Sequence, residues 1–131
     1  MKQHEQALLF LKKAAEDEAL LDAVITVLSV ADATFGFHCQ QAAEKLLKAL
    51  LSEFSVRFHR THDLQELMNL LEAAGHKLPE TLGRVDELTP FAVEFRYEDL
   101  SFAPHFDRLA ARELLRQLRN YVESRVQGPR P

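Results

Sequence analysis

Apolar residues recur along most of this chain at intervals of three or four, the spacing that places them on one side of an α-helix. The first such segment runs from about Gln3 to Ala31. It holds its apolar stripe at Ala7, Phe10, Leu11, Ala14, Ala15 and Leu21. The β-branched residues of "DAVITVLSVAD" would suit a strand locally. A lone strand would have no partner elsewhere in the chain, so we predict that this stretch is helical.

Four more helices are predicted after it. The second covers about Thr34 to Phe54, with one apolar stripe at Phe35, Cys39, Ala42, Leu46 and Leu50. The third opens with Asp63 and Glu66, the D-x-x-E pattern of a capping box, and ends at Gly75. Its predicted apolar face consists of Leu64, Leu67, Met68 and Leu71.

Prolines mark the start of the last two helices, because proline is accepted in a first helical turn. The fourth follows Pro79 and covers about Glu80 to Arg96, with a disturbance near Pro90. The fifth runs from Pro104 to about Arg125, with an inward face predicted at Phe106, Leu109, Ala110, Leu114, Leu118 and Tyr121. These patterns predict an all-α fold, an up-and-down, mostly antiparallel bundle of about five helices. One domain is expected over residues 1–126, with a frayed tail over 127–131.

Composition and charge narrow the classes of function. The chain has 131 residues, a net charge of −4 and a single cysteine, Cys39. One cysteine excludes an intrachain disulfide and fits a reducing compartment. The acidic balance argues against wrapping duplex DNA, whose binding proteins usually carry a basic surplus. With no signal peptide and no bilayer-length apolar run, we expect a soluble, cytoplasmic protein without a membrane partner.

The polar residues around His62 are the candidates for chemistry. His59 and His62, with His38, are too few and too loosely spaced to predict a metal site, and no cofactor is predicted. His62 and Asp63 have a structural reading, as residues that stabilise the start of a helix. In the alternative reading His62 is a general acid or base at a phosphodiester, with Arg57 or Arg60 steadying the charge.

Three further sets of residues are candidates for ligand binding. Arg57, His59, Arg60 and His62 form a cationic cluster ahead of a helix N-terminus, where a nucleotide phosphate or RNA would be attracted. Gln41, Glu44, Lys45 and Lys48 lie off the apolar stripe of the second helix and alone would form a solvated face. Arg96 and Tyr97 could clamp either Glu44 or a phosphate.

Three stretches occur together in a recognisable order: "FHCQQAAEKLLKALL", "RTHDLQELMNLL" and "FAVEFRYED". Their combination resembles the HEPN domain over about residues 13–126. The resemblance implies a homodimeric helical bundle common in prokaryotes. It also implies a frequent pairing with a minimal nucleotidyltransferase in a two-protein, toxin–antitoxin-like system, and nucleotide binding. Surplus apolar surface, including Phe54, Phe58, Phe91, Phe95 and Phe102, likewise points to a homodimer.

Nuclease members of that family carry an arginine, commonly followed by a polar residue, and a histidine shortly after it near the C-terminus. The best match here, Arg119-Asn120, is followed by "YVESRVQG" without a histidine. Arg57 and His62 have the spacing, but they lie in the connector before the third helix. We therefore predict a non-enzymatic binding module, with a metal-independent endoribonuclease using Arg57 and His62 as the alternative.

Overall fold

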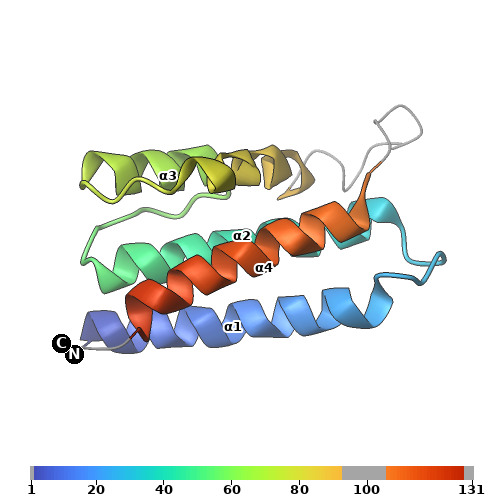
Figure 1. Cartoon of the computed structure of the whole chain (residues 1–131), viewed down its shortest axis with the longest axis horizontal. Helices are drawn as coiled ribbons and strands as arrows, with labels where there is room; N and C mark the ends of the chain where they lie inside the picture. Colours follow the sequence, from blue (N-terminus) through green and yellow to red (C-terminus); the bar gives the residue numbers. More distant parts are fainter. Residues whose placement is uncertain (1, 93–105, 129–131) are drawn as a thin grey trace.

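The protein is an all-α bundle, as the sequence predicts. The computed structural model describes residues 2–92 and 106–128 (Figure 1). These residues form four α-helices and one 3₁₀ helix: α1 (Lys2–Val24), α2 (Asp32–Glu53), α3 (Leu64–Ala73), η1 (Glu80–Ala92) and α4 (Arg108–Val126). None of these helices is long and apolar enough to cross a membrane.

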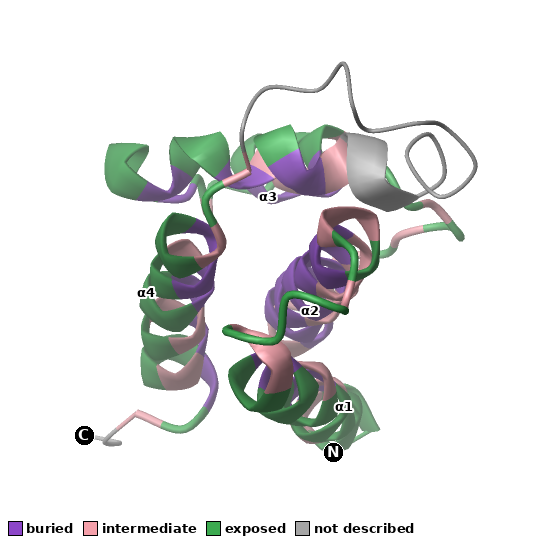
Figure 2. Ribbon diagram, turned by 90° about the vertical axis from the view of Figure 1, so that its right-hand side faces the viewer, coloured by how far each residue is buried: buried purple, intermediate pink, exposed green. Residues whose placement is uncertain are grey.

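Helix α2 forms the centre of the bundle and contacts all four other helices. The stripe predicted for it is buried throughout, with Phe35 at 1% exposure and Cys39, Ala42, Leu46 and Leu50 at 0%. Figure 2 shows α2 as the most buried helix, between α1 on one side and α3 on the other. Burial raises the pKa of the Cys39 thiol to about 12, so this residue belongs to the core.

Consecutive helices alternate in direction with one exception. Helix α3 runs the same way as α2, because the connector over residues 54–63 first returns along α2 (Figure 1). Two contacts mark this arrangement. The backbone oxygen of His62, at the start of α3, accepts from Gln40 in the middle of α2, and Phe54, just past the end of α2, stacks on His76 after α3.

Helix α1 ends at Val24, seven residues earlier than predicted, and residues 25–31 form turns. The prediction of a helix through Ala31 is therefore wrong. Arg108 takes the place of the missing helical hydrogen bonds: its guanidinium donates to the backbone oxygens of Val24, Val27 and Val30. The β-branched residues of this stretch favour a helix weakly, and a distant arginine stabilises the turns instead.

The fourth helix is a 3₁₀ helix rather than the predicted α-helix. Its buried side chains, Leu82, Val85 and Leu88, are spaced three residues apart. A helix with three residues per turn keeps such a series on one side, whereas an α-helix would rotate it steadily away. The predicted extension to Arg96 and the predicted start of the last helix at Pro104 lie outside the described residues, as do Phe95, Phe102 and the tail from residue 129.

Helix α4 buries only part of the predicted face: Phe106, Leu114 and Tyr121 are partly buried against the core, as expected. Leu109 is 71% exposed and Ala110 is exposed, although Leu118 is buried as expected. The face that packs inward consists of Ala111, Arg112, Leu115, Leu118, Val122 and Val126. A rotation of the helix toward Arg112 selects this second apolar stripe, because it brings the arginine to carboxylates on α1.

The ends of α2 and α3 share one geometry. After α3, Gly75 has φ of 86°, its N–H donates to Glu72, and the N–H of His76 donates to Leu71, as in a Schellman motif. Gly75 thus ends α3 as predicted. After α2 the equivalent position is Ser55, with φ of 57°, the one non-glycine residue of the described chain with positive φ.

Candidate functional site

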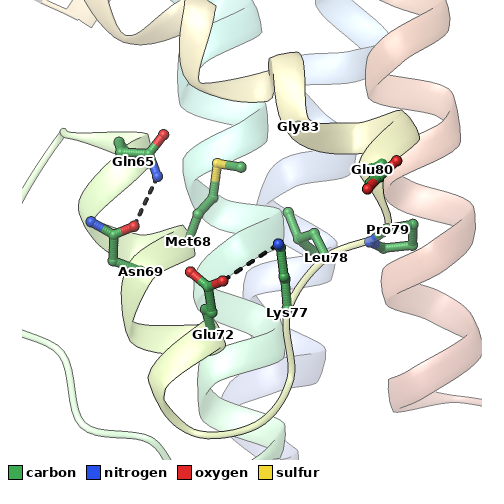
Figure 3. A pocket seen from close by; sticks show the side chains of 9 residues that line it. All are labelled: Gln65, Met68, Asn69, Glu72, Lys77, Leu78, Pro79, Glu80 and Gly83. Atoms are coloured by element: carbon green, nitrogen blue, oxygen red, sulfur yellow. Dashed lines mark hydrogen bonds and ion pairs between the residues drawn. The ribbon is translucent and has the colours of Figure 1, made fainter.

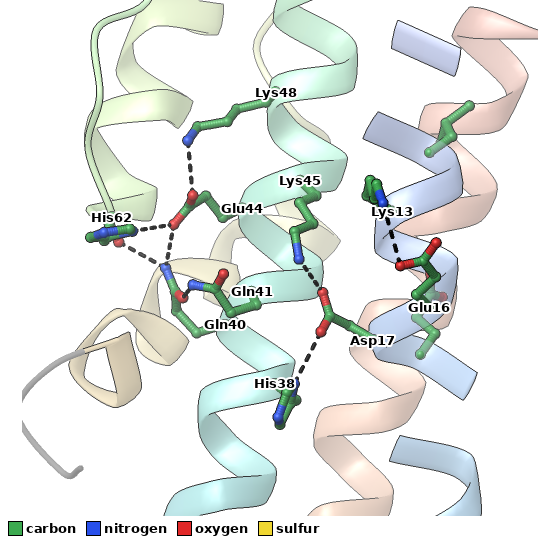
Figure 4. Close-up of polar contacts among 12 residues, drawn as sticks. Lys13, Glu16, Asp17, His38, Gln40, Gln41, Glu44, Lys45, Lys48 and His62 are labelled. Carbon is green, nitrogen blue, oxygen red and sulfur yellow. Dashed lines mark hydrogen bonds and ion pairs between the residues drawn. The ribbon is translucent and has the colours of Figure 1, made fainter. Parts of the chain in front are cut away.

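Glu44 on α2 is the centre of a buried hydrogen-bond network (Figure 4). Its carboxylate accepts from Gln40 at 3.0 Å and from Lys48 at 2.8 Å. Nδ1 of His62 lies 2.8 Å from the same carboxylate, and a carboxylate only accepts, so this ring nitrogen carries the proton. Glu44 is 6% exposed. The reading of this flank of α2 as a solvated face is therefore wrong for Glu44.

The network keeps Glu44 ionised. Burial is the largest single influence on its pKa and raises it, but the hydrogen bonds from Lys48, His62 and Gln40, together with the charge of Lys48, act in the opposite direction. The net effect is a pKa below the usual glutamate value. A charged carboxylate in this position can orient the imidazole of His62.

The connector is anchored to α2 through His62 at two points. Gln40 donates to the backbone oxygen of His62 at 2.9 Å, and Glu44 holds its ring. The side chain of His62 remains 54% exposed, and no described residue pairs with its Nε2. Nearby, the ammonium group of Lys48 lies 5.8 Å from the ring centroid of Phe58. These contacts fix a segment that lacks secondary structure and present one imidazole nitrogen to solvent.

The start of α3 is capped, although not by the predicted reciprocal box. The carboxylate of Asp63 accepts from the N–H of Gln65, as expected for an N-cap. Glu66 accepts from the hydroxyl of Thr61 instead of the Asp63 amide, and that amide donates to the Thr61 hydroxyl. The amide of Leu64 donates to Thr89. These first-turn amides have internal acceptors, so an anion bound here would rely on side chains.

The connector carries two exposed guanidinium groups. Arg57 and Arg60 are exposed, and within the described part of the chain neither forms an ion pair. Their neighbour His59 lies 2.7 Å from Glu66. Within the described residues, Arg57 and Arg60 are therefore the two cations of the predicted cluster without an ion-pair partner, and both lie close to His62 in sequence.

A second polar cluster lies between α2 and α1 on the face drawn in Figure 4. Asp17 accepts from Lys45 at 2.5 Å, and Nδ1 of His38 lies 3.0 Å from it. Gln41, a predicted site residue, donates to Gln40 at 2.8 Å. The sequence patterns do not single out Gln40 or Asp17. The position of Gln40 one helical turn before Glu44 could have suggested the first, but nothing in the sequence pairs Asp17 with α2.

Arg119, the best match to the nuclease arginine, is held by contacts within the fold. Its guanidinium donates to Glu18 at 2.7 Å and to the backbone oxygen of Leu11 at 2.9 Å. Arg112 donates to the same glutamate and to Asp22. Glu18 is 4% exposed. This cluster joins α4 to α1, and it leaves Arg119 without a free donor set for a substrate.

The histidines do not converge on a metal. His38, His59 and His62 each pair with a different carboxylate. The described residues contain no group of three histidine, cysteine, aspartate or glutamate side chains that could hold an ion. Arg96 and Tyr97, the remaining predicted site residues, lie outside the described residues.

A shallow pocket of about 230 Å³ lies between α3 and η1 (Figure 3). Met68 and Leu78 form part of its wall, and the Glu72–Lys77 ion pair, at 3.5 Å, lies along one side. None of the predicted ligand-binding residues lines it. The candidate site is thus the connector with its Glu44 network, rather than this pocket.

In comparison with protein families, the family model of the HEPN domain matches residues 5–128. Comparison with curated proteins and with solved structures gives no significant match.

Proposed function

Because the chain belongs to the HEPN domain family, we propose that it is a non-enzymatic binding module. In this proposal it forms a homodimer and pairs with a small nucleotidyltransferase in a two-protein, toxin–antitoxin-like system. It binds the phosphate groups of a nucleotide through the connector. The family match supports the type of domain, and the connector supports the choice of ligand.

The observation that supports a phosphate ligand is the pair of exposed arginines on the anchored connector. Arg57 and Arg60 lack ion-pair partners among the described residues, in a protein whose net charge is −4. Of the other arginines that the structure describes, all except Arg125 pair with carboxylates; Arg84 and Glu87 are one example, and Arg116 and Glu113 another. Guanidinium groups held by a fixed backbone lose less freedom when they bind a phosphate, and they match its geometry with paired donors.

Calorimetric titration of ATP and GTP tests this ligand. We expect the wild type to bind a nucleotide at up to millimolar concentration and Arg57→Ala/Arg60→Ala to lose the binding. The matched control is Arg84→Ala/Arg116→Ala, which removes two exposed arginines elsewhere and changes net charge equally. No binding to wild type, or equal losses in the two double variants, would refute the connector as the nucleotide site.

The partner is tested separately. The gene beside the one for this protein is expected to encode a minimal nucleotidyltransferase, and the two proteins, co-expressed with one of them tagged, are expected to co-purify. A neighbour of another class, or a nucleotidyltransferase that does not co-purify, would refute the pairing without affecting the nucleotide site.

One observation favours a second function, a metal-independent endoribonuclease. Glu44 orients His62 so that Nε2 faces solvent, an arrangement that can accept or donate a proton at a phosphodiester, with Arg57 available to steady the charge. Labelled single-stranded RNA incubated with the protein in EDTA distinguishes the two functions. Our proposal predicts no cleavage. Cleavage that survives EDTA and is abolished in His62→Ala would establish the nuclease instead.

A further inference from the structure

Helix α1 carries a second stripe on the side opposite its core-facing one. Leu9, Lys13, Glu16 and Leu20 follow each other at intervals of four, three and four residues, which places them within about 60° of each other around the helix. Core-facing residues Ala7, Leu11, Ala14, Glu18 and Leu21 occupy the opposite side. Figures 1 and 2 show α1 at the outer edge of the bundle, and all four residues of the stripe are exposed.

This stripe exposes apolar surface that the monomer does not cover. Leu9 is 55% exposed and Leu20 is 41% exposed. Between them lie Lys13 and Glu16, an ion pair of 3.8 Å whose side chains are also more than half exposed (Figure 4). The leucines are about 16 Å apart along the helix axis, so each end of the stripe is apolar and its middle is charged.

The stripe is complementary to its own reversed copy. If two α1 helices are placed antiparallel about a twofold axis between residues 14 and 15, Leu9 lies opposite Leu20 of the second copy. Lys13 then lies opposite Glu16 of the second copy, and the symmetry repeats each contact. A parallel arrangement would instead place each charged residue opposite its own equivalent, which is repulsive. The intervals of four and three are also those of a coiled-coil seam, the pattern by which helices interlock along a stripe.

We propose that α1 pairs with α1 of a second copy in this antiparallel, twofold arrangement. The proposal rests on the homodimer of the proposed function and specifies its interface. Such an interface is isologous, the closed type found in most dimers. The other strongly exposed leucines, Leu28 and Leu109, lie outside this stripe.

Charge reversal tests the pairing by sedimentation. Lys13→Glu and Glu16→Lys each create two like-charge contacts per dimer, so each is expected to raise the dimer dissociation constant at least about tenfold. The double variant Lys13→Glu/Glu16→Lys restores opposite charges and is expected to return to within about threefold of wild type. Arg116→Glu, which breaks another exposed ion pair of the same spacing with Glu113, is the control and is expected to leave dimerisation unchanged.

Disulfide trapping tests the direction of the helices. Mixing Leu9→Cys protein with Leu20→Cys protein under oxidising conditions is expected to give the covalent dimer, whereas either variant alone is expected to give little. Cys39 is completely buried and does not compete. If each variant formed a covalent dimer with itself, and no disulfide joined Leu9→Cys to Leu20→Cys in the mixture, the pair would be parallel and the proposal overturned.

The outcomes separate this interface from the proposed function. A wild-type dimer that is insensitive to both single reversals would overturn the α1 interface alone. A wild type that is monomeric at tens of micromolar would overturn both the interface and the homodimer. Nucleotide binding and pairing with the nucleotidyltransferase are measured independently and could survive either result.

Discussion

Replacement of Glu44 by glutamine is the most direct test of the network that fixes the connector. Glutamine has nearly the same size as glutamate, so the substitution removes a charge and leaves the packing volume unchanged. An amide oxygen in the place of Oε1 can still accept from both Gln40 and His62, but the amide NH₂ then points toward Lys48. Lys48, whose side chain is only 12% exposed, loses its carboxylate partner and must be rehydrated or stay unpaired.

The expected cost follows from these contacts. A net hydrogen bond to a charged group contributes about 1.5–3 kcal/mol, and removal of one partner of a buried ion pair costs about 3–5 kcal/mol. Because Lys48 retains some access to water and the introduced glutamine keeps one acceptor, we expect a loss of about 2–4 kcal/mol in the free energy of unfolding. For a chain of this length that corresponds to a fall in melting temperature on the order of 10 °C.

Urea unfolding at pH 7, followed by circular dichroism, measures this loss. The control is Glu113→Gln, the same chemical change at an exposed residue of α4 that pairs with Arg116, and its unfolding free energy is expected to match wild type within error. A loss below about 1 kcal/mol in Glu44→Gln would refute the argument, because it would mean that Lys48 and His62 gain little from the carboxylate.

Glu44→Gln also tests how the stability of the protein depends on pH. The pKa of Glu44 in the folded protein is lower than the ordinary 4.5, so the unfolded chain binds the proton more readily. Stability from this group is therefore complete above about pH 4.5 and is lost as the pH falls through the folded pKa. The difference between wild type and Glu44→Gln should shrink in acid, and a difference that grew below pH 4.5 would contradict this sign.

Two other substitutions and one labelling experiment test separate parts of the fold. Ser55→Gly should stabilise the protein by about 0.5–1 kcal/mol in urea unfolding, because glycine adopts positive φ without strain; a destabilised variant would contradict this. Glu18→Gln should cost about 2–4 kcal/mol, since Arg112 and Arg119 share that buried carboxylate, and an unchanged midpoint would show that their other acceptors suffice. Cys39 should resist a thiol reagent at about pH 8 in the native protein and react after unfolding, whereas rapid native labelling would refute its burial.

The sequence by itself determined that the described elements are helices, and it determined most of their core. The buried stripe of α2 follows from the spacing of its apolar residues, because burial of one side is what makes such a spacing favourable. Asp63 and Gly75 mark the ends of α3 through local hydrogen bonding and local backbone freedom. Each of these predictions depends on residues within a few positions of each other.

The sequence did not decide which face of α4 is buried or where α1 ends. Helix α4 has two overlapping apolar stripes, and the buried one is selected by ion pairs from Arg112 and Arg119 to Glu18, about a hundred positions earlier in the chain. Helix α1 stops at Val24 because the guanidinium of Arg108 binds backbone oxygens at the end of the helix and in the turns that follow it. No local pattern contains these contacts, since their energy comes from groups brought together only by packing.

The candidate site shows the same division. Sequence analysis selected Arg57, Arg60 and His62 as a cationic cluster, because they lie close together along the chain. Only the tertiary structure paired His62 with Glu44, 18 positions away, by returning the connector along α2. Burial strengthens the interaction between Glu44 and His62. On a solvated helix face the charge of Glu44 would be screened by water and would have little effect, whereas in a site with little water it can hold an imidazole in one orientation.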